Sequence, residues 1–233
     1  MPPSATALRS NFRLPCASRC GDDMTLAAGT AKYFYPNRMG RVILVAMESA
    51  MGRERLDEVL KAAKLESLKK LPPNNLEKRF PFEWVSSLQE ATESVYGERA
   101  GRSLNARVGR LCFNSGLKEF EPVLGIADLP MRLMPLSMKF RVGLEVFARV
   151  FNQFSDQIVR LSEEEGGFLW IIERNPVCWG RQTTEPCCHL ALGILDELVF
   201  WGTGGRRYRV EESECIAVGA KACMFRIDKK PMD

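Results

Sequence analysis

The chain has 233 residues, of which 45% are hydrophobic and 27% are charged, and this composition is typical of a globular protein with a substantial core. Its 33 basic and 29 acidic residues give a net charge of +4 without a dense lysine and arginine tract, which argues against nucleic acid as a partner. The longest apolar run, RVILVAMESAM, is far shorter than the ~18 to 20 residues of a membrane-spanning helix, so no transmembrane segment is expected.

The first residues differ in composition from the rest of the chain. MPPSATALRSNFRLPCASRC contains three arginines and no acidic residue, which is typical of an organellar transit peptide. Translation from an upstream start site gives the same appearance, and Met24 and Met39 are both candidate first residues. Residues 1–38 are therefore expected to be a leader, either disordered or a start-site extension. The cysteine usage and the lack of a secretory signal predict a reducing compartment, the cytoplasm unless the leader is a genuine transit peptide.

The first half of the chain has a helical pattern. Apolar residues recur at helical spacing from Met39 to Ala63, and Gly52 divides this stretch into two predicted helices. KKLPPNNLEKRF is predicted as a loop, and FEWVSSLQEATESVYG as a helix that ends at Gly97. ERAGRSLNARVGRLCFNSG is predicted as a further helix that ends at Gly116. The proline-rich stretch LKEFEPVLGIADLPMRLMP is then expected to connect two parts of the molecule.

The second half begins with the most regular helical pattern, MKFRVGLEVFARVFNQFS, and then changes its period. QIVRLSEEEGGFLWIIER predicts a β-hairpin, because the glycines between its two runs of β-formers supply the positive φ of a tight turn. CCHLALGILDELVFWGTGG is predicted as a helix with a glycine stop, and RRYRVEESE and ACMFRID as two strands. We therefore expect an α+β fold, in which a helical region (residues 39–130) packs on a small antiparallel sheet of order β-β-α-β-β (residues 131–233).

Cysteines near the end of the chain are candidate metal ligands. In EESECIAVGAKACMFRI, Cys215 and Cys223 stand eight positions apart, and Glu212 stands three residues before the first. Because Cys215 follows one predicted strand and Cys223 begins the next, both can approach one point. Further candidates lie upstream: Cys178, Cys187, Cys188 and His189. Thiolates with a carboxylate or an imidazole suit a tetrahedral zinc ion, although buried thiols also pack as small hydrophobic residues.

The block VEESECIAVGAKACMFRI, with the helix and hairpin before it, resembles the 4-vinyl reductase domain family, and NQFSDQIVR and NPVCWGR resemble its stand-alone members. The similarity runs from about Tyr33 to the end and is most specific after Asp156. It implies a fold similar to haem nitric-oxide-binding domains and to a TRAPP-complex subunit, which enclose an apolar ligand. It also implies a homodimer and a hydrophobic ligand, either a tetrapyrrole intermediate of bacteriochlorophyll biosynthesis or an aromatic hydrocarbon.

The aromatic-sensing members of this family hold zinc with a Cys, then Glu-x-x-Cys, then a Cys eight positions further on. The resemblance therefore implies Glu212, Cys215 and Cys223 as zinc ligands, with Cys188 as the upstream ligand. Four protein ligands leave no open position for water, so the implied zinc is structural. Cys178, Cys187 and His189 stay open as alternatives to Cys188.

Aromatic residues on the most regular helix and the adjacent strand are candidate walls of an apolar ligand pocket: Phe140, Phe147, Phe151, Phe154 and Trp170. Their spacing also fits ordinary core packing. Four arginines share one arc of an earlier helix and are candidates for binding acidic groups, although a solvated helix face explains them as well: Arg99, Arg102, Arg107 and Arg110.

The sequence gives little support for a self-sufficient enzyme. A nicotinamide or flavin site commonly uses a glycine loop from a strand to a helix, whereas GTGG stands between a helix and a strand. His189 is the single histidine, which limits acid–base chemistry. The sequence therefore favours a protein that binds a hydrophobic small molecule. The alternative is a 4-vinyl reductase, or an accessory protein, in chlorophyll biosynthesis.

Overall fold

The computed structural model of the protein describes residues 31–124 and 136–232. Most of the expected leader, and the middle of the expected connection between the two halves, lie outside the described residues. Within these residues, no helix is both long enough and apolar enough to cross a membrane.

The first half consists mainly of helices, as predicted. Helices α1 (Asn37–Met51) and α2 (Arg53–Ala62) are separated by Gly52, whose φ of 83° is accessible to glycine at little cost. After the short 3-10 turn η1 (Glu66–Lys69), helix α3 (Phe82–Tyr96) ends at Gly97, which also has a positive φ of 79°. Both glycines therefore mark helix ends that the sequence predicted.

Helix α4 (Glu98–Leu124) is longer than expected, and its predicted end at Gly116 is wrong. The extension brings the ring of Phe120 to 6.2 Å from that of Phe154 and places the Arg38 guanidinium 5.6 Å from the Phe120 ring centroid. Glycine in a helix costs only about 1 kcal/mol relative to alanine, so such packing is enough to carry the helix past it.

Two short strands were not predicted. Strand β1 (Phe34–Pro36) pairs antiparallel with strand β2 (Lys78–Pro81). The folded chain therefore begins before Met39, and the expected leader of residues 1–38 is too long. The end of KKLPPNNLEKRF is likewise a strand rather than a loop. Neither segment has a periodic pattern of its own, because each is stabilised by the other across about forty residues of chain.

The second half contains α5 (Leu136–Phe154), β3 (Val159–Glu164), β4 (Gly167–Ile172), the 3-10 turn η4 (Pro176–Cys178), α6 (His189–Gly202), β5 (Tyr208–Glu214), the 3-10 turn η5 (Ile216–Val218) and β6 (Cys223–Pro231). The four strands form an antiparallel sheet in the order β3-β4-β6-β5, so β6 lies inside the sheet. The α+β class with a β-β-α-β-β second half is confirmed.

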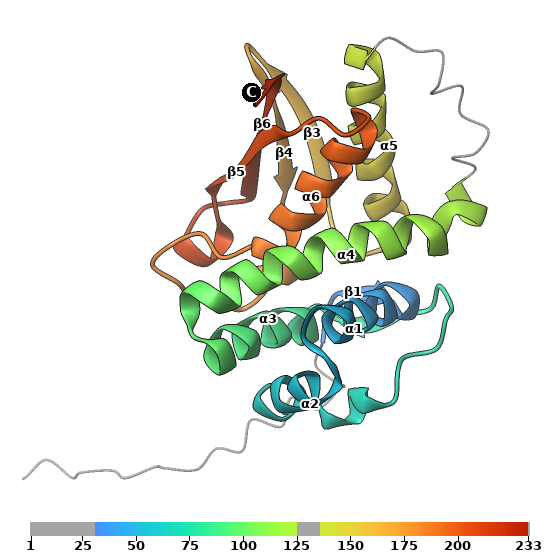
Figure 1. Ribbon diagram of the computed structural model, residues 1–233, viewed down its shortest axis with the longest axis vertical. Helices are drawn as coiled ribbons and strands as arrows, with labels where there is room; N and C mark the ends of the chain where they lie inside the picture. Colours follow the sequence, from blue (N-terminus) through green and yellow to red (C-terminus); the bar gives the residue numbers. More distant parts are fainter. Residues whose placement is uncertain (1–30, 125–135, 233) are drawn as a thin grey trace, which may run out of the picture.

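The molecule is layered (Figure 1). Helices α5 and α6 cover one face of the four-stranded sheet, α4 crosses α6, and α1 and α3 lie on the far side of α4. The crossing of α4 and α6 is unusually close. A Cβ on Gly193 would lie 1.9 Å from the carbonyl oxygen of Ala106, and a Cβ on Gly109 would lie 2.2 Å from that of Leu190. Glycine at both positions lets the two backbones touch.

Strand β1 connects the helical half to the segment that precedes β3. The Phe34 backbone N–H donates a hydrogen bond to Asp156 Oδ2 (2.9 Å), and the Asp156 N–H donates to the Phe34 carbonyl oxygen (3.1 Å). The Tyr35 hydroxyl donates to Gln157 Oε1 at 2.6 Å within the core. The two halves are therefore fastened together by residues that were assigned to the leader.

Candidate metal centre and apolar cavity

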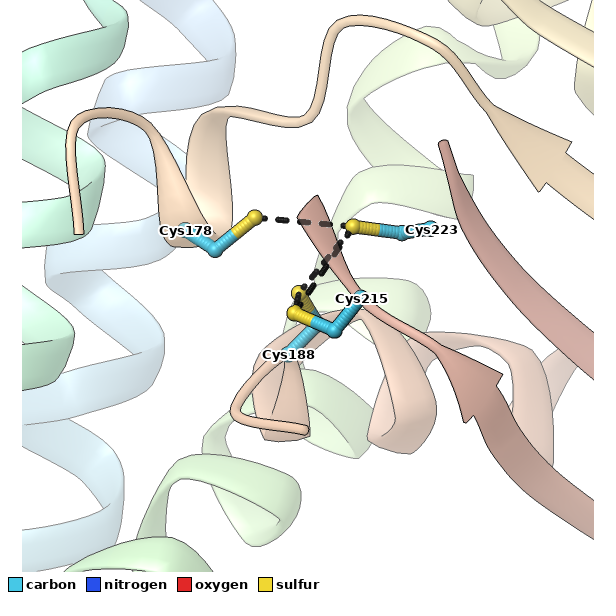
Figure 2. Close-up of side chains that lie close together, drawn as sticks. All are labelled: Cys178, Cys188, Cys215 and Cys223. Atoms are coloured by element: carbon cyan, nitrogen blue, oxygen red, sulfur yellow. Dashed lines mark hydrogen bonds between the residues drawn. The ribbon is translucent and has the colours of Figure 1, made fainter. Parts of the chain in front are cut away.

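Four buried cysteines meet at one end of the sheet (Figure 2). Cys178 ends the turn η4, Cys188 directly precedes α6, Cys215 follows β5, and Cys223 begins β6. Each of the four is at most 1% exposed, and their sulfur atoms all lie within 4.8 Å of one another. The cluster is therefore closed to solvent and assembled from four separate segments.

The spacing of the sulfur atoms suits a metal ion. The Sγ–Sγ distances are 3.5 Å for Cys178–Cys223, 3.7 Å for Cys188–Cys215 and for Cys188–Cys223, and 4.0 Å for Cys215–Cys223. Four thiolates about 2.3 Å from a central zinc ion stand about 3.8 Å apart in a tetrahedron. A disulfide needs about 2.05 Å. These residues are therefore close enough to hold a metal ion, and their spacing and donor type fit a tetrahedral thiolate site.

Local hydrogen bonds orient the sulfur atoms. The Asn175 side chain accepts a hydrogen bond from the Val177 N–H (3.1 Å), which caps η4, and its Nδ2 donates to Cys188 Sγ (3.2 Å). The Ile216 N–H donates to Cys223 Sγ at 3.3 Å. Donors aimed at sulfur stabilise thiolates, and the position of Cys188 at the N-terminus of α6 does the same.

Glu212 lies beside the cluster. Its Oε2 accepts a hydrogen bond from the Cys188 backbone N–H at 2.8 Å, whereas its Oε1 is buried without a hydrogen-bond partner among the described residues. Burial is the main cause that raises the pKa of this carboxyl group to about 9. Glu212 thus anchors the start of α6 and retains one acceptor oxygen that a cation or a proton would satisfy.

The charge within the cluster is shared among the thiols. Hydrogen bonds from Cys178, Cys187 and Cys188 lower the pKa of Cys215, whereas burial raises the pKa of Cys188. One thiolate surrounded by thiols is therefore the favoured state of the sulfur atoms on their own. A divalent cation would allow the remaining thiols to lose their protons as well.

The structure also places the other candidate ligands. Cys187 is buried, but its sulfur is not one of the four that lie within 4.8 Å of one another. His189 begins α6 and is half-buried, and burial lowers the pKa of its ring. The sequence signal for Cys178 is the Asn175-Pro176 pair, which favours a tight turn and here directs the Cys178 thiol toward Cys223.

An apolar cavity of about 100 Å³ lies between α1, α4, α5 and α6. Its walls are apolar side chains and glycines: Met39, Val42, Cys112, Phe113, Gly116, Leu117, Phe120, Gly143, Val146, Phe147, Val150, Phe151, Ile194, Leu198 and Trp201. The α1 and α4 contributions were missed by sequence reasoning, because helical periodicity identifies a buried face but not a gap within it.

A smaller cavity of about 50 Å³ lies beyond the side chains of Phe147, Phe151 and Ile194, which line both cavities. It extends to strand β4 and also contacts two polar side chains, Gln157 and Asn175. Since Asn175 also donates to Cys188 Sγ, it touches both the smaller cavity and the cysteine cluster. The two candidate sites are therefore neighbours.

The predicted pocket aromatics lie in different places. Phe147 and Phe151 line both cavities, and Trp170 lines the smaller one. Phe140 instead lines a depression near the other end of the sheet, and Phe154 packs against Phe120 without lining either internal cavity.

The arginines of α4 that are ion-paired face neighbouring segments. Arg102 pairs with Glu98 and with Glu185, and Arg110 lies 3.5 Å from Asp196 of α6. For these two arginines, bridging between segments accounts for the charge.

Comparison with solved structures identifies the class of fold. The H-NOX protein from S. oneidensis in its Fe(II)NO ligation state is 11% identical, with 85% of this chain and 99% of that chain covered and a TM-score of 0.52. The unliganded Fe(II) H-NOX protein from K. algicida is 13% identical, with 85% and 97% covered and a TM-score of 0.52. A Cs H-NOX mutant is 14% identical, with 84% and 98% covered and a TM-score of 0.54. This protein therefore has an H-NOX-like α+β fold.

The family follows from the sequence of the second half. Residues 170–229 match the model of the 4-vinyl reductase domain and belong to that family, which is the one that the sequence resembles. The matched segment contains all four clustered cysteines. No curated protein sequence matches the chain.

Proposed function

We propose that the protein binds a small hydrophobic molecule in its apolar cavity. The observation that carries this proposal is the lining of the cavity, which contains only apolar side chains and glycines although four helices contribute to it. Such a site binds by removing apolar surface from water. The 4-vinyl reductase domain and the H-NOX-like fold support small-molecule binding as the general activity.

The size of the cavity favours a small ligand. An engineered protein cavity of about 150 Å³ holds one benzene molecule. The two internal cavities, of about 100 and 50 Å³, come close to that volume when Phe147 and Phe151 turn aside. A tetrapyrrole has four such rings and would require the helices to separate. Of the two ligand classes that the family resemblance implies, the aromatic hydrocarbon is therefore our proposal.

Titration calorimetry with toluene, accompanied by thermal melting, tests this proposal. We expect saturable binding and a rise in Tm with ligand concentration. Val150→Phe should abolish binding and leave the melting temperature unchanged or higher, because the new ring fills the cavity. Val45→Phe, at an exposed position of α1, is the control. Toluene binding that is absent, or that persists in Val150→Phe, would contradict the proposal, and turnover of a divinyl tetrapyrrole with NADPH alone would favour the reductase.

We further propose that zinc occupies the cysteine cluster in a structural role. Cys188, Cys215 and Cys223 are common to the sequence-based set and to the four-sulfur cluster. The fourth ligand is then either Cys178, which the sulfur spacing favours, or Glu212, which the family resemblance implies. The ion would supply a cross-link between η4, α6, β5 and β6.

X-ray absorption of the zinc-loaded protein separates the two ligand sets, since four sulfurs at about 2.3 Å differ from three sulfurs and one oxygen. We expect Cys178→Ser to lower zinc affinity strongly and Glu212→Gln to retain bound zinc. The reverse pattern would establish Glu212 as the fourth ligand. Native mass spectrometry of the same samples tests the homodimer that the resemblance implies.

A further inference from the structure

A third depression, of about 660 Å³, lies at the end of the sheet opposite the cysteine cluster. The strand register defines this separation: Cys223 pairs with Ile172, whereas Tyr208 pairs with Pro231 at the far end of β6. In Figure 1 this end carries the chain end marked C and the first turns of α5. The proposed function uses neither this depression nor the residues that line it.

Aromatic side chains from three elements form the floor of the depression. Phe140 comes from α5, Phe168 from β4 and Tyr208 from β5. The Phe140 ring centroid lies 5.3 Å from that of Phe168 and 5.1 Å from that of Tyr208. Rings held at this separation in tilted arrangements offer edges and faces to a further aromatic group.

Cationic side chains form the rim. Arg141 and Lys229 share the carboxylate of Glu163, at 3.1 and 2.7 Å, and Arg141 also pairs with Glu145 at 2.9 Å. Arg206 also lines the depression, and within the described part of the chain no acidic group forms an ion pair with it. The Lys229 ammonium lies 5.0 Å from the Phe168 ring centroid. Positive charge is therefore in excess beside an aromatic surface.

We propose that this depression is a second ligand site, for an aromatic molecule that carries a negative charge. Its volume falls in the range of about 300 to 1,000 Å³ that is typical of small-molecule sites. The aromatic part would pack on the floor, and a carboxylate or sulfonate would contact Arg206 and Lys229. The internal cavity offers no cation to such a ligand, so the two sites select different molecules.

Two fluorescent probes test the proposal. 1-Anilinonaphthalene-8-sulfonate carries two aromatic groups and one negative charge, and N-phenyl-1-naphthylamine has the same rings without the charge. We expect one saturable site for the anionic probe, with a Kd about tenfold lower than that of the neutral probe. Added salt should weaken the anionic probe alone.

Arg206→Gln and Lys229→Gln should each weaken the anionic probe about tenfold and leave the neutral probe unchanged. Arg160→Gln is the matched control, because Arg160 lies on β3 and pairs with Glu173 at 2.5 Å near the opposite end of the sheet. Equal binding of the two probes, or retained binding in both variants, would overturn the proposal. So would displacement by saturating toluene, since the probe would then occupy the internal cavity. Circular dichroism confirms that each variant is folded.

Discussion

Cys223 lies nearest to the centre of the cysteine cluster, since its sulfur is within 4.0 Å of each of the other three. We expect Cys223→Ser to reduce bound zinc from about one ion per chain to near zero and to lower the melting temperature, because a neutral hydroxyl is a poor zinc ligand. Plasma emission spectrometry of the purified variants measures the metal.

Cys112→Ser is the control for this experiment, because Cys112 is buried in α4 and lines the apolar cavity rather than the cluster. It should keep its zinc while losing some stability from the buried hydroxyl. Full zinc content in Cys223→Ser would refute the assignment of this centre.

Tyr35 tests the contact between the two halves at a single atom. Its hydroxyl donates to Gln157 Oε1 in the core, and burial raises the pKa of the hydroxyl. Tyr35→Phe should lower the free energy of unfolding by about 1 to 3 kcal/mol, because the amide oxygen is left without its donor. Urea denaturation measures the change, and Tyr96→Phe at the partly exposed end of α3 is the control. Equal midpoints would show that the hydrogen bond contributes nothing.

The sequence identified part of the candidate centre. The spacing around Cys215 and Cys223 is local, so a hairpin with a cysteine at each end brings the two thiols together whatever the rest of the chain does. Cys178 depends on the path of the chain between β4 and α6, which only the folded turn at Asn175 determines. Long-range placement of this kind has no signature in residue spacing.

At the level of elements, the crossing of α4 and α6 sets the distance between the helical layer and the sheet. Gly193→Ala would place a methyl group 1.9 Å from the Ala106 carbonyl oxygen, which the backbone of α4 cannot avoid without moving. We expect a loss of at least ~3 kcal/mol in the free energy of unfolding.

Gly143→Ala in α5 is the matched control for the crossing, because no heavy atom lies within 4 Å of its added Cβ. Alanine should stabilise this helix by up to ~1 kcal/mol. Guanidinium denaturation compares the variants, and similar midpoints for Gly193→Ala and the unmodified protein would show that the helices can shift freely.

Helices and the β3–β4 hairpin were predictable because their signals are local: helical periodicity, helix-ending glycines and a two-glycine turn. Strands β1 and β2 were not, because each is only three or four residues long and depends on a distant partner. The same reason explains α4, where packing of Phe120 against Phe154 outweighs the glycine signal at residue 116.

At the scale of the whole molecule, β1 fastens the helical half to the sheet half. A chain that starts at Met39 lacks the Phe34–Asp156 and Tyr35–Gln157 hydrogen bonds and the entire β1–β2 pairing. We expect it to be less stable than a chain that starts at Met24 by more than ~2 kcal/mol, or to aggregate. Melting of the two shorter chains measures the difference, and equal stability would mean that this connection is dispensable.

The order of the strands has a consequence for synthesis. Because β6 fills the place between β4 and β5, a nascent chain on the ribosome can display both of those strands while the site between them is still vacant. At that stage a metal ion arriving from the surrounding solution meets at most three of the four sulfurs. Loading of the centre therefore has to wait until the final strand has left the exit tunnel.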